Sequence, residues 1–423
     1  MKFHELIEKI NNSDTELCRL YPDIEAARTR LTSLLHGFAD RYGRGGDLVL
    51  LSVPGRTELV GNHVDHNGGA VLAGSITRDI IAVARRESDG VIRMQSEGRP
   101  EDVITVGMTA STDSFERESS ASLIAGVVNG FVKAGYEVGG FSAYTTTEVL
   151  SGSGLSSSAA FECMVGTVIN HLYCDGAVSA LDISKIAQYS ENEYFGKPCG
   201  LMDQIACAYG GFVFIDFKEK CEPYVMLMEL SLGEAGLGLC IVATGGSHSD
   251  LTDDYASVPR EMKSVANYLS HELLKDVTES EIVENIKPLR ESVGDRAVLR
   301  ALHFVRECER SRRAKEAVLG GDIDALLECL NKSGRSSFEY LQNVYTVKNT
   351  DEQGISLALA LTDGYLSGTR SSYRVHGGGF AGTIQAIMPK ELIAGYTELM
   401  ESVFGEGCVM ALDIRAVGAT RIF

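Results

Sequence analysis

The residues best suited to bind a small polar ligand lie in PGRTELVGNHVDHNGG, residues 54–69. Arg, Glu, Asn, Asp and two His fall within eleven positions here, beside several glycines. Carboxylates accept hydrogen bonds and imidazole or amide groups donate them, which matches the alternating hydroxyls of a polyol. The spacing of His63 and His66 in a loop is poor support for a metal site. We therefore expect a sugar-like ligand, in preference to a purely structural Asx-rich turn.

A second segment, SGSGLSSSAAFE at residues 151–162, has the composition of a phosphate-binding loop. Small residues let the backbone approach a ligand, and the helix that follows directs N–H groups and its positive dipole end toward it. The segment lacks the lysine of a GxxxxGK(S/T) loop, which argues against a Walker-type nucleotide site. On these residues alone, a serine-capped helix after a flexible turn explains the segment equally well.

Two further segments contain candidate residues. Asp203 follows a Cys-Gly turn within residues 191–210 and falls in the first turn of an expected helix. An aspartate there is commonly a helix cap, and Glu191 by itself is typical of a solvated helix position. The cluster HGGGFAG at 376–382 has four glycines and imposes an irregular backbone between two regular elements. Four glycines exceed what a simple turn requires.

Hydrophobic periodicity predicts the elements that position these segments. The pattern predicts an N-terminal helical segment over residues 1–43. It also predicts strands of an N-terminal sheet over residues 48–60, 70–86 and 91–97. A helix at 119–134 and a strand at 141–150 precede the Gly/Ser loop, and a helix at 158–173 follows it. Further helices are expected near 182–194, 202–209, 352–363 and 390–404, and strands at GGFVFIDF, LGLCIVATGG and TIQAIMP. We place a boundary near residue 225, between an N-terminal lobe at 1–225 and a C-terminal lobe at 226–423.

Length and charge restrict the class of protein. The 423 residues, 44% hydrophobic and 23% charged, describe a globular chain long enough for two domains with a ligand site between them. The 39 Lys and Arg against 58 Asp and Glu give a net charge of −19, which disfavours binding to nucleic acid or an anionic membrane. The N-terminal segment lacks a continuous apolar stretch, so we expect a cytoplasmic protein. The ten cysteines form no CxxC pair, and we expect neither zinc nor disulfides.

Taken together, these segments resemble the galactokinase branch of the GHMP small-molecule kinases, from about Phe38 to the C-terminus. That family carries a GRxN(L/I)IGEHxDY sugar signature, a GxGLSSSA phosphate loop, a CGIMDQ catalytic segment and a GGGFGG loop. This chain has GRTELVGNHVDH, GSGLSSSA, CGLMDQ and GGGFAG in the same order. Shorter similarities are FADRYG before the first motif, Asp253–Tyr255 where the family has SEY, and VYTVKNTDEQGISLAL at 344–359.

The resemblance implies a two-lobed α+β fold with the active site in the cleft between the lobes. It also implies ATP-dependent phosphorylation of the anomeric hydroxyl of a galactose-like sugar. By position, Asp203 is then the catalytic carboxylate near the sugar O1, and Arg56 is its companion. Mg²⁺ is the implied cofactor, with Ser158 and Glu191 as ligands, since a hydroxyl and a carboxylate suit this ion.

The resemblance also assigns the residues that would contact ATP and sugar. The implied phosphate loop comprises Gly152, Ser153, Gly154, Leu155, Ser156, Ser157 and Ser158. The implied sugar contacts are His63, Asp65, Gly200 and Tyr255, while Gly378 and Gly379 shape the loop near nucleotide and substrate.

Three residues depart from the family pattern. Asn62 stands where the signature has Glu, His66 where it has Tyr, and Ala381 where the last loop has Gly. Loss of a carboxylate that accepts from a sugar hydroxyl should weaken that contact by about 1–3 kcal/mol, unless Asn62 supplies its own acceptor. Glu58 stands where the signature has Asn, at an even separation that points both side chains to one face of an extended segment. We therefore hypothesise that Glu58 and Asn62 both line a rearranged sugar pocket.

These departures leave alternatives open. Removing a carboxylate reduces repulsion against an anionic or bulkier substituent, so galacturonate, N-acetylgalactosamine and arabinose are rival substrates. A sugar- and ATP-responsive regulator without turnover is another alternative, but Arg56, Ser158, Glu191 and Asp203 are all present, which favours an enzyme. A dinucleotide-dependent oxidoreductase is a weak alternative because the glycine loop lacks GxGxxG spacing. We expect a monomer whose partners are a small-molecule sugar and ATP.

Overall fold

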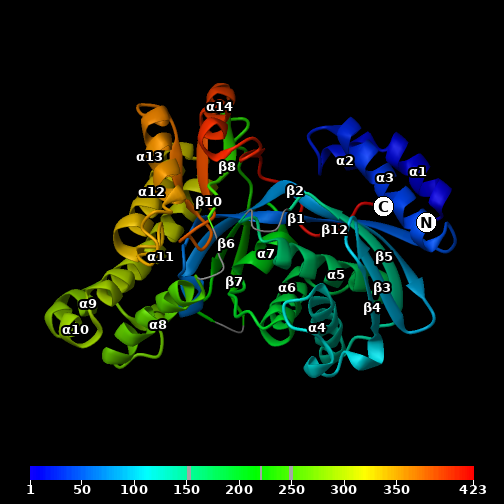
Figure 1. Cartoon of the computed structure of the whole chain (residues 1–423), viewed down its shortest axis with the longest axis horizontal. Helices are drawn as coiled ribbons and strands as arrows, with labels where there is room; N and C mark the ends of the chain where they lie inside the picture. The colour runs from blue at the N-terminus through cyan, green and yellow to red at the C-terminus, as the bar shows by residue number, and fades with distance from the viewer. Residues whose placement is uncertain (150–153, 220–221, 247–250) are drawn as a thin grey trace.

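Two β-sheets organise the computed structural model, which describes residues 1–149, 154–219, 222–246 and 251–423 (Figure 1). The first sheet has eight strands in the order β12-β1-β2-β5-β3-β4, with β6 paired to β2 and β7 paired to β6. β3 and β5 are parallel, whereas β1 with β2 and β2 with β5 are antiparallel. Its strands are β1 (Leu48–Val60), β2 (Ala70–Glu87), β3 (Val91–Ser96), β4 (Glu101–Thr105), β5 (Gly140–Thr147), β6 (Phe212–Asp216), β7 (Tyr224–Met228) and β12 (Thr420–Arg421).

Helices cover both faces of this sheet, so its central strands are buried (Figure 1). Successive side chains of a strand point to opposite faces. Leu48 and Leu50 of β1 therefore join the core beneath the N-terminal helices, whereas Leu51 and Val53 join the core on the opposite face. The N-terminal helices are α1 (Phe3–Asn12), α2 (Asp14–Cys18) and α3 (Ile24–Tyr42), and those on the opposite side are α4 (Ser120–Lys133), α5 (Ser157–Tyr173), α6 (Ala180–Tyr189) and α7 (Met202–Tyr209).

The second sheet has four antiparallel strands in the order β11-β8-β10-β9. Its strands are β8 (Leu237–Ala243), β9 (Ser372–His376), β10 (Thr383–Pro389) and β11 (Val409–Leu412). Side chains of α13 (Gly354–Leu366) and α14 (Ile393–Phe404) share a core with one face of this sheet, and α12 (Ile323–Ser336) contributes to the core on the other. The remaining helices are α8 (Thr252–Tyr268), α9 (Glu279–Glu284), α10 (Ile286–Val293) and α11 (Asp295–Leu319).

A buried aspartate joins the N-terminal helices to the first sheet and to the C-terminal segment. Asp79 of β2 is fully buried, and its carboxylate accepts hydrogen bonds from Tyr21 (2.9 Å), Arg30 (2.5 Å) and Arg415 (3.0 Å). Ser52 donates a further hydrogen bond to it. Because the four donors come from distant parts of the sequence, this cluster holds both ends of the chain against the sheet.

The predicted α+β class is confirmed, and so are most of the predicted elements. The predicted strand at 141–150 is β5, which ends at Thr147. The predicted helix near 182–194 begins as α6 and continues as a π-helical segment, Ser190–Phe195. No helix among the described residues is long and apolar enough to cross a membrane.

The division of the chain into two lobes stays a prediction. The proposed boundary near residue 225 falls within β7, which still belongs to the first sheet. The C-terminal strand β12 returns to that sheet and pairs with β1 at Leu51 and Ser52. Division by sheets would therefore assign both β7 and β12 to the N-terminal unit.

Candidate active site

Arg56 and Asp203 are 147 positions apart in the sequence, and the fold brings their side chains together. Arg56 lies in β1 next to an irregularity in its pairing with β2, and Asp203 lies in the first turn of α7. Arg56 donates two hydrogen bonds to the Asp203 carboxylate, from Nε at 2.6 Å and from Nη2 at 3.0 Å. Its Nη1 donates to the carbonyl oxygen of Gly154 at 2.5 Å. One guanidinium therefore links the predicted catalytic carboxylate to the predicted phosphate loop.

The surroundings of Asp203 favour its ionised form. Burial alone would raise the pKa of this carboxyl, but the charge and hydrogen bonds of Arg56 and a hydrogen bond from Ser156 outweigh burial. The pKa of Asp203 consequently lies below its ordinary value. The Arg56 side chain is 7% exposed and that of Asp203 is 32% exposed, so the carboxylate, unlike its partner, is accessible to a ligand.

The described part of the predicted phosphate loop begins at Gly154, which contacts Arg56 of the first sheet and Thr383 of the second. Gly154 has a φ of 72°, and a Cβ there would lie 2.5 Å from Thr383 Oγ1, so no larger residue fits without displacing its neighbours. Ser156 also has a left-handed backbone (φ 60°) and immediately precedes α5. Leu155 holds the loop in position, because its carbonyl oxygen accepts a hydrogen bond from the backbone N–H of Arg56 at 3.2 Å and its side chain is fully buried. The predicted loop residues Gly152 and Ser153 lie outside the described residues.

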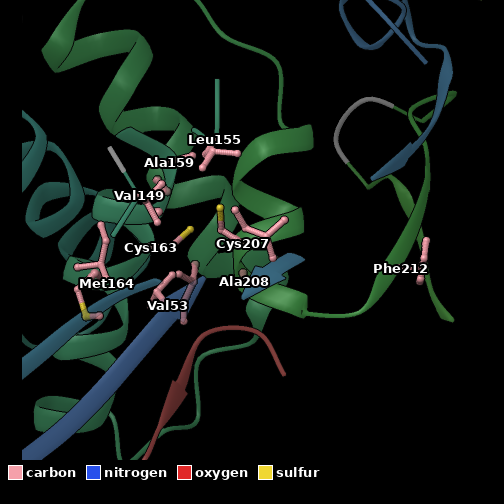
Figure 2. Close-up of a cluster of buried hydrophobic side chains, with 14 of the residues drawn as sticks. Val53, Val149, Leu155, Ala159, Cys163, Met164, Cys207, Ala208 and Phe212 are labelled. Carbon is pink, nitrogen blue, oxygen red and sulfur yellow. The ribbon is translucent and has the colours of Figure 1, made fainter. Parts of the chain in front are cut away.

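The packing beneath the loop is apolar. Figure 2 shows Leu155, Ala159 and Val149 near Cys163 and Cys207 in this core. Cys163 comes from α5 and Cys207 from α7, so this core fixes the helix after the loop against the helix that carries Asp203.

Ser158 and Glu191, the predicted metal ligands, are in contact. Ser158 Oγ donates to Glu191 Oε1 at 3.0 Å, and Gln204 Nε2 donates to Glu191 Oε2 at 3.0 Å. The same Gln204 nitrogen lies 3.3 Å from Glu162 Oε2. Burial and the neighbouring Glu191 raise the pKa of Glu162 well above its ordinary value. No group of three or more His, Cys, Asp or Glu in the described chain could hold a metal, so an ion here would need oxygens from phosphate and water.

His63 and Tyr255 both contact the glycine cluster at 376–382. His63 Nε2 donates to Gly378 O at 2.8 Å, and Tyr255 OH donates to Gly379 O at 2.9 Å. Burial lowers the pKa of His63 to about 4, so its imidazole is neutral near pH 7. Gly379 has a φ of 77°, and a Cβ there would lie 2.0 Å from Asn343 O. Ala381 is not among the residues with positive φ, which explains why alanine is tolerated where the family has glycine.

Asp65 lies directly against Gly200. A Cβ at position 200 would lie 1.6 Å from Asp65 Oδ2, so a larger residue would displace this carboxylate from its present position. Asp65 Oδ1 accepts from the backbone N–H of His66 at 2.9 Å, and the His66 side chain is 35% exposed. The turn before α7 and the segment with the sugar signature therefore pack closely together at Gly200 and Asp65.

The structure argues against the predicted direct sugar contacts of Glu58 and Asn62. Both are buried, at 3% and 1% exposure, and Asn62 Nδ2 donates to Glu58 Oε1 at 2.9 Å and to Gly377 O at 2.7 Å. Asn62 Oδ1 accepts from Asn343 Nδ2 at 2.7 Å. Glu58 Oε1 also accepts from Arg374 Nη2 at 2.8 Å. The exchanged Asn and Glu therefore remain a hydrogen-bonded pair whose charge an internal arginine balances.

Sequence reasoning missed Arg374, Asn343 and Gln204. Arg374 is a single charged residue in an otherwise ordinary strand, and Asn343 lies outside every glycine-rich segment. Neither has a local pattern that signals its contact with residues about 300 positions earlier. Gln204 adjoins Asp203 in the catalytic motif, and this proximity is the one signal that could have marked it.

Comparison with known proteins agrees with the resemblance that the sequence motifs indicate. The family model for the GHMP kinases N terminal domain matches residues 119–211, and that for the galactokinase galactose-binding signature matches residues 36–86. A galactokinase from Enterococcus faecalis is 28% identical over 397 residues, which cover 92% of this chain and 99% of the relative. A galactokinase from Streptomyces coelicolor is 27% identical over 372 residues, which cover 87% and 91%.

Solved structures agree as well. Lactococcus lactis galactokinase complexed with galactose has a TM-score of 0.78 at 25% identity and covers 93% of this chain and 100% of its own. Methanococcus jannaschii mevalonate kinase, with a TM-score of 0.61 at 12% identity over 87% of this chain and 99% of its own, shares the fold. These matches show that the chain is similar to the GHMP kinases over most of its length, and they indicate a phosphotransferase that acts on a hydroxyl acceptor. Among those kinases, the matched sugar signature and the two relatives are those of galactokinases.

Proposed function

We propose that this protein phosphorylates the anomeric hydroxyl of galactose with ATP, giving α-D-galactose 1-phosphate and ADP. The observation that carries the proposal is the contact of Arg56 with both Asp203 and Gly154. It joins the predicted catalytic carboxylate, the sugar signature and the phosphate loop in one place. The galactokinase relatives support galactose as the acceptor.

In this proposal Asp203 orients the sugar hydroxyl and Arg56 stabilises charge on the transferring phosphoryl group. A carboxylate with a lowered pKa is a weak base. Phosphoryl transfer through a loose transition state depends mainly on positioning and charge neutralisation, so a weak base suffices. Asp203 accepts the hydroxyl proton as the bond to phosphorus forms.

We also propose Mg²⁺ as the cofactor, held by Ser158 and Glu191. A hydroxyl and a carboxylate side by side at 3.0 Å are ligands of the type this ion prefers. When bound, the ion neutralises phosphate charge during transfer. The rest of the ATP phosphate chain would contact the backbone of Gly154, Leu155, Ser156 and Ser157, and of Gly152 and Ser153.

The proposed sugar contacts are His63, Asp65, Gly200 and Tyr255. Asp65 supplies acceptor oxygens, and the turn at Gly200 lies directly against it. His63 and Tyr255 each donate to the glycine cluster, so they also fix the backbone of residues 378 and 379 next to the sugar. Glu58 and Asn62 would act from beneath this pocket, through the backbone that they support.

One observation favours a second candidate, a related sugar as substrate. Asn62 has no free polar atom to offer a sugar hydroxyl, because its amide already bonds to Glu58, Gly377 and Asn343. A pocket without that carboxylate would tolerate galacturonate, N-acetylgalactosamine or arabinose better than one with it.

The cytoplasmic location, the monomeric state and the absence of nucleic-acid or membrane partners remain predictions. The net charge of −19 supports the last of them. Analytical ultracentrifugation of the purified protein would measure the oligomeric state.

A sugar panel tests the proposed function. ADP release should be measured with ATP and Mg²⁺ for galactose, 2-deoxygalactose, N-acetylgalactosamine, galacturonate, arabinose and glucose, with Asp203→Asn as the inactive control. Galactose should give the highest kcat/KM. A higher value for another sugar would favour the second candidate, and sugar binding without turnover would favour a regulator.

A further inference from the structure

Lys197 lies in the loop that connects the Glu191 segment to α7, between the proposed metal ligand and Asp203. Glu191 anchors this loop, because its carbonyl oxygen accepts from Gly196 N at 3.0 Å and Lys197 N at 3.1 Å. Two residues later, Cys199 N donates to Asn192 Oδ1 at 2.7 Å. The loop backbone is therefore fixed, and the position of Lys197 relative to Glu191 is determined.

The Lys197 side chain is held only weakly. Its Nζ lies 3.9 Å from Glu191 Oε1, at the long limit of an ion pair, and the side chain is 67% exposed, whereas that of Glu191 is 4% exposed. Glu191 already accepts shorter hydrogen bonds from Ser158 and Gln204. A long, flexible lysine side chain in water gains little from such a contact and is free to change partner.

The other charges nearby leave this cation available to a ligand. Asp203 is paired with Arg56 in two hydrogen bonds. After burial, Arg56 and Ser156, the charge of Lys197 is the next influence on the pKa of Asp203, and it lowers that pKa. Lys197 is thus close enough to act electrostatically on the catalytic carboxylate without being bound to it.

The phosphate loop lacks a cation of its own. Residues 151–162 contain no Lys or Arg, and the chain as a whole carries a net charge of −19. A nucleoside triphosphate is a polyanion, and the carboxylates of Glu191 and Asp203 would repel it. Arg56, the cation that contacts Gly154, is already paired with Asp203, and backbone N–H groups at the start of α5 supply only partial charge. A lysine beside the loop would therefore supply a further full charge.

We propose that Lys197 is a phosphate-binding residue, whose ammonium group leaves Glu191 and binds the terminal phosphates of the nucleotide. This inference rests on the proposed ATP-dependent function. It assigns to the loop before α7 a direct role in nucleotide binding, in addition to presenting Asp203.

Calorimetry of ADP binding in EDTA tests the inference without turnover and without metal. Lys197→Met should raise the Kd for ADP about tenfold, the size expected for loss of one charge-assisted hydrogen bond. Lys197→Arg should retain most of the affinity because it keeps the charge. Lys332→Met is the matched control, since Lys332 is also more than half exposed and paired with one glutamate. The Kd of this variant for ADP should equal that of the wild type.

A second background separates phosphate binding from an effect through Glu191. In Glu191→Gln, the lysine no longer has the Glu191 carboxylate to neutralise, so Lys197→Met should still raise the Kd for ADP about tenfold if Lys197 contacts phosphate. Lys197→Met should raise the Kd for AMP less than the Kd for ADP, because AMP lacks the terminal phosphate. Equal Kd values for ADP with and without Lys197 in this background would overturn the inference.

Failure of the proposed function gives a different result. A wild-type protein that neither binds ADP nor releases it from ATP with any sugar would contradict the kinase proposal itself. A wild-type protein that binds ADP, with an unchanged affinity in Lys197→Met, would contradict the role of Lys197 alone.

Discussion

The proposed catalysis depends, at the level of single residues, on the Arg56–Asp203 pair. Two hydrogen bonds fix the carboxylate in orientation, and a third fixes the same guanidinium to Gly154. Paired contacts of this kind add geometric specificity as well as energy. The pair therefore sets both the position and the charge of Asp203.

Replacing Arg56 should change the pH dependence of the reaction. With Arg56 present, the pKa of Asp203 is below its ordinary value, so the active ionised form persists into mildly acidic solution. In Arg56→Met, burial is no longer opposed by that charge, and the pKa should rise. The acid limb of the kcat/KM profile should move upward by about one pH unit or more, in addition to a loss of rate.

The pH profile of Arg56→Lys is the control, because lysine keeps the charge without the two-point contact. Its acid limb should lie closer to that of the wild type. Identical acid limbs for Arg56→Met and the wild type would contradict the electrostatic role of Arg56.

Gly200 should be intolerant of even one additional carbon. A Cβ at this position would lie 1.6 Å from Asp65 Oδ2, so Gly200→Ala must displace the carboxylate that we assign to the sugar. A displacement of about 1 Å can cost on the order of 100-fold, which we expect in kcat/KM for galactose.

Steady-state kinetics with each substrate varied would measure the effect of Gly200→Ala. Gly364→Ala is the control, because a Cβ there meets no atom within 4 Å. The KM for ATP should change little in either variant. A wild-type kcat/KM for galactose in Gly200→Ala would rule out a sugar contact through Asp65.

Individual site residues could be predicted from the sequence only where they belong to a recognisable motif. The sequence motifs identified Arg56, Asp203, Ser158 and Glu191, and the fold brings these into two contacting pairs. The orientation of Glu58 and Asn62 was not predictable. An even spacing indicates one face of a strand, but whether that face meets solvent or Arg374 depends on a strand 316 positions away.

At the scale of elements, short connections position the chemistry. Strand β5 and helix α5 flank the predicted phosphate loop, as the sequence predicted, and α7 brings Asp203 next to Ser156. The π-helical segment at 190–195 was not predictable, because its periodicity differs little from that of an α-helix over six residues. It places Glu191 next to both Ser158 and Gln204.

The contact of β1 with β9 should depend on the buried pair of Glu58 and Arg374. Both side chains are almost fully buried, so removing the cation leaves an uncompensated carboxylate. Arg374→Met should lower the free energy of unfolding by about 3–5 kcal/mol. In the Glu58→Gln background the same substitution should cost less, because no carboxylate is left unpaired.

Urea unfolding of the four proteins in this cycle would measure the coupling between Glu58 and Arg374. Equal costs of Arg374→Met in both backgrounds would show that the two charges do not stabilise each other.

At the scale of the whole molecule, the site needs both sheets in place. Gly154 is pressed against Thr383 and His376 of the second sheet, and Arg56 belongs to the first. The sequence predicted the α+β class and most helices through periodicity. It did not predict that the last strand returns to the first sheet, because two residues of β12 carry no usable pattern.

The Asp79 cluster should link the stability of the whole fold to pH. Burial would raise the pKa of Asp79, but Arg30 and Arg415 hold it below its ordinary value. A lowered pKa contributes stability that is present above the unfolded-state pKa and is lost as pH falls through the folded-state pKa. Asp79→Asn should therefore lower the free energy of unfolding by about 3–5 kcal/mol at pH 7.

Urea unfolding of the wild type and Asp79→Asn between pH 7 and about 3 would test this linkage. Their difference should be constant at neutral pH and shrink below about pH 4, where unfolded aspartate becomes protonated. A difference that persists unchanged at the lowest pH would contradict the assigned direction.

The identity of the reaction product tests the proposed phosphorylation of galactose most directly. Wild-type protein with ATP, Mg²⁺ and galactose should be followed by ³¹P and ¹H NMR, beside Asp203→Asn. A new phosphomonoester coupled to the anomeric proton of galactose should form in equal amount to ADP, and none should form with Asp203→Asn. Phosphorylation at another hydroxyl, no phosphorylated galactose, or an Asp203→Asn variant as active as the wild type would contradict the proposed function.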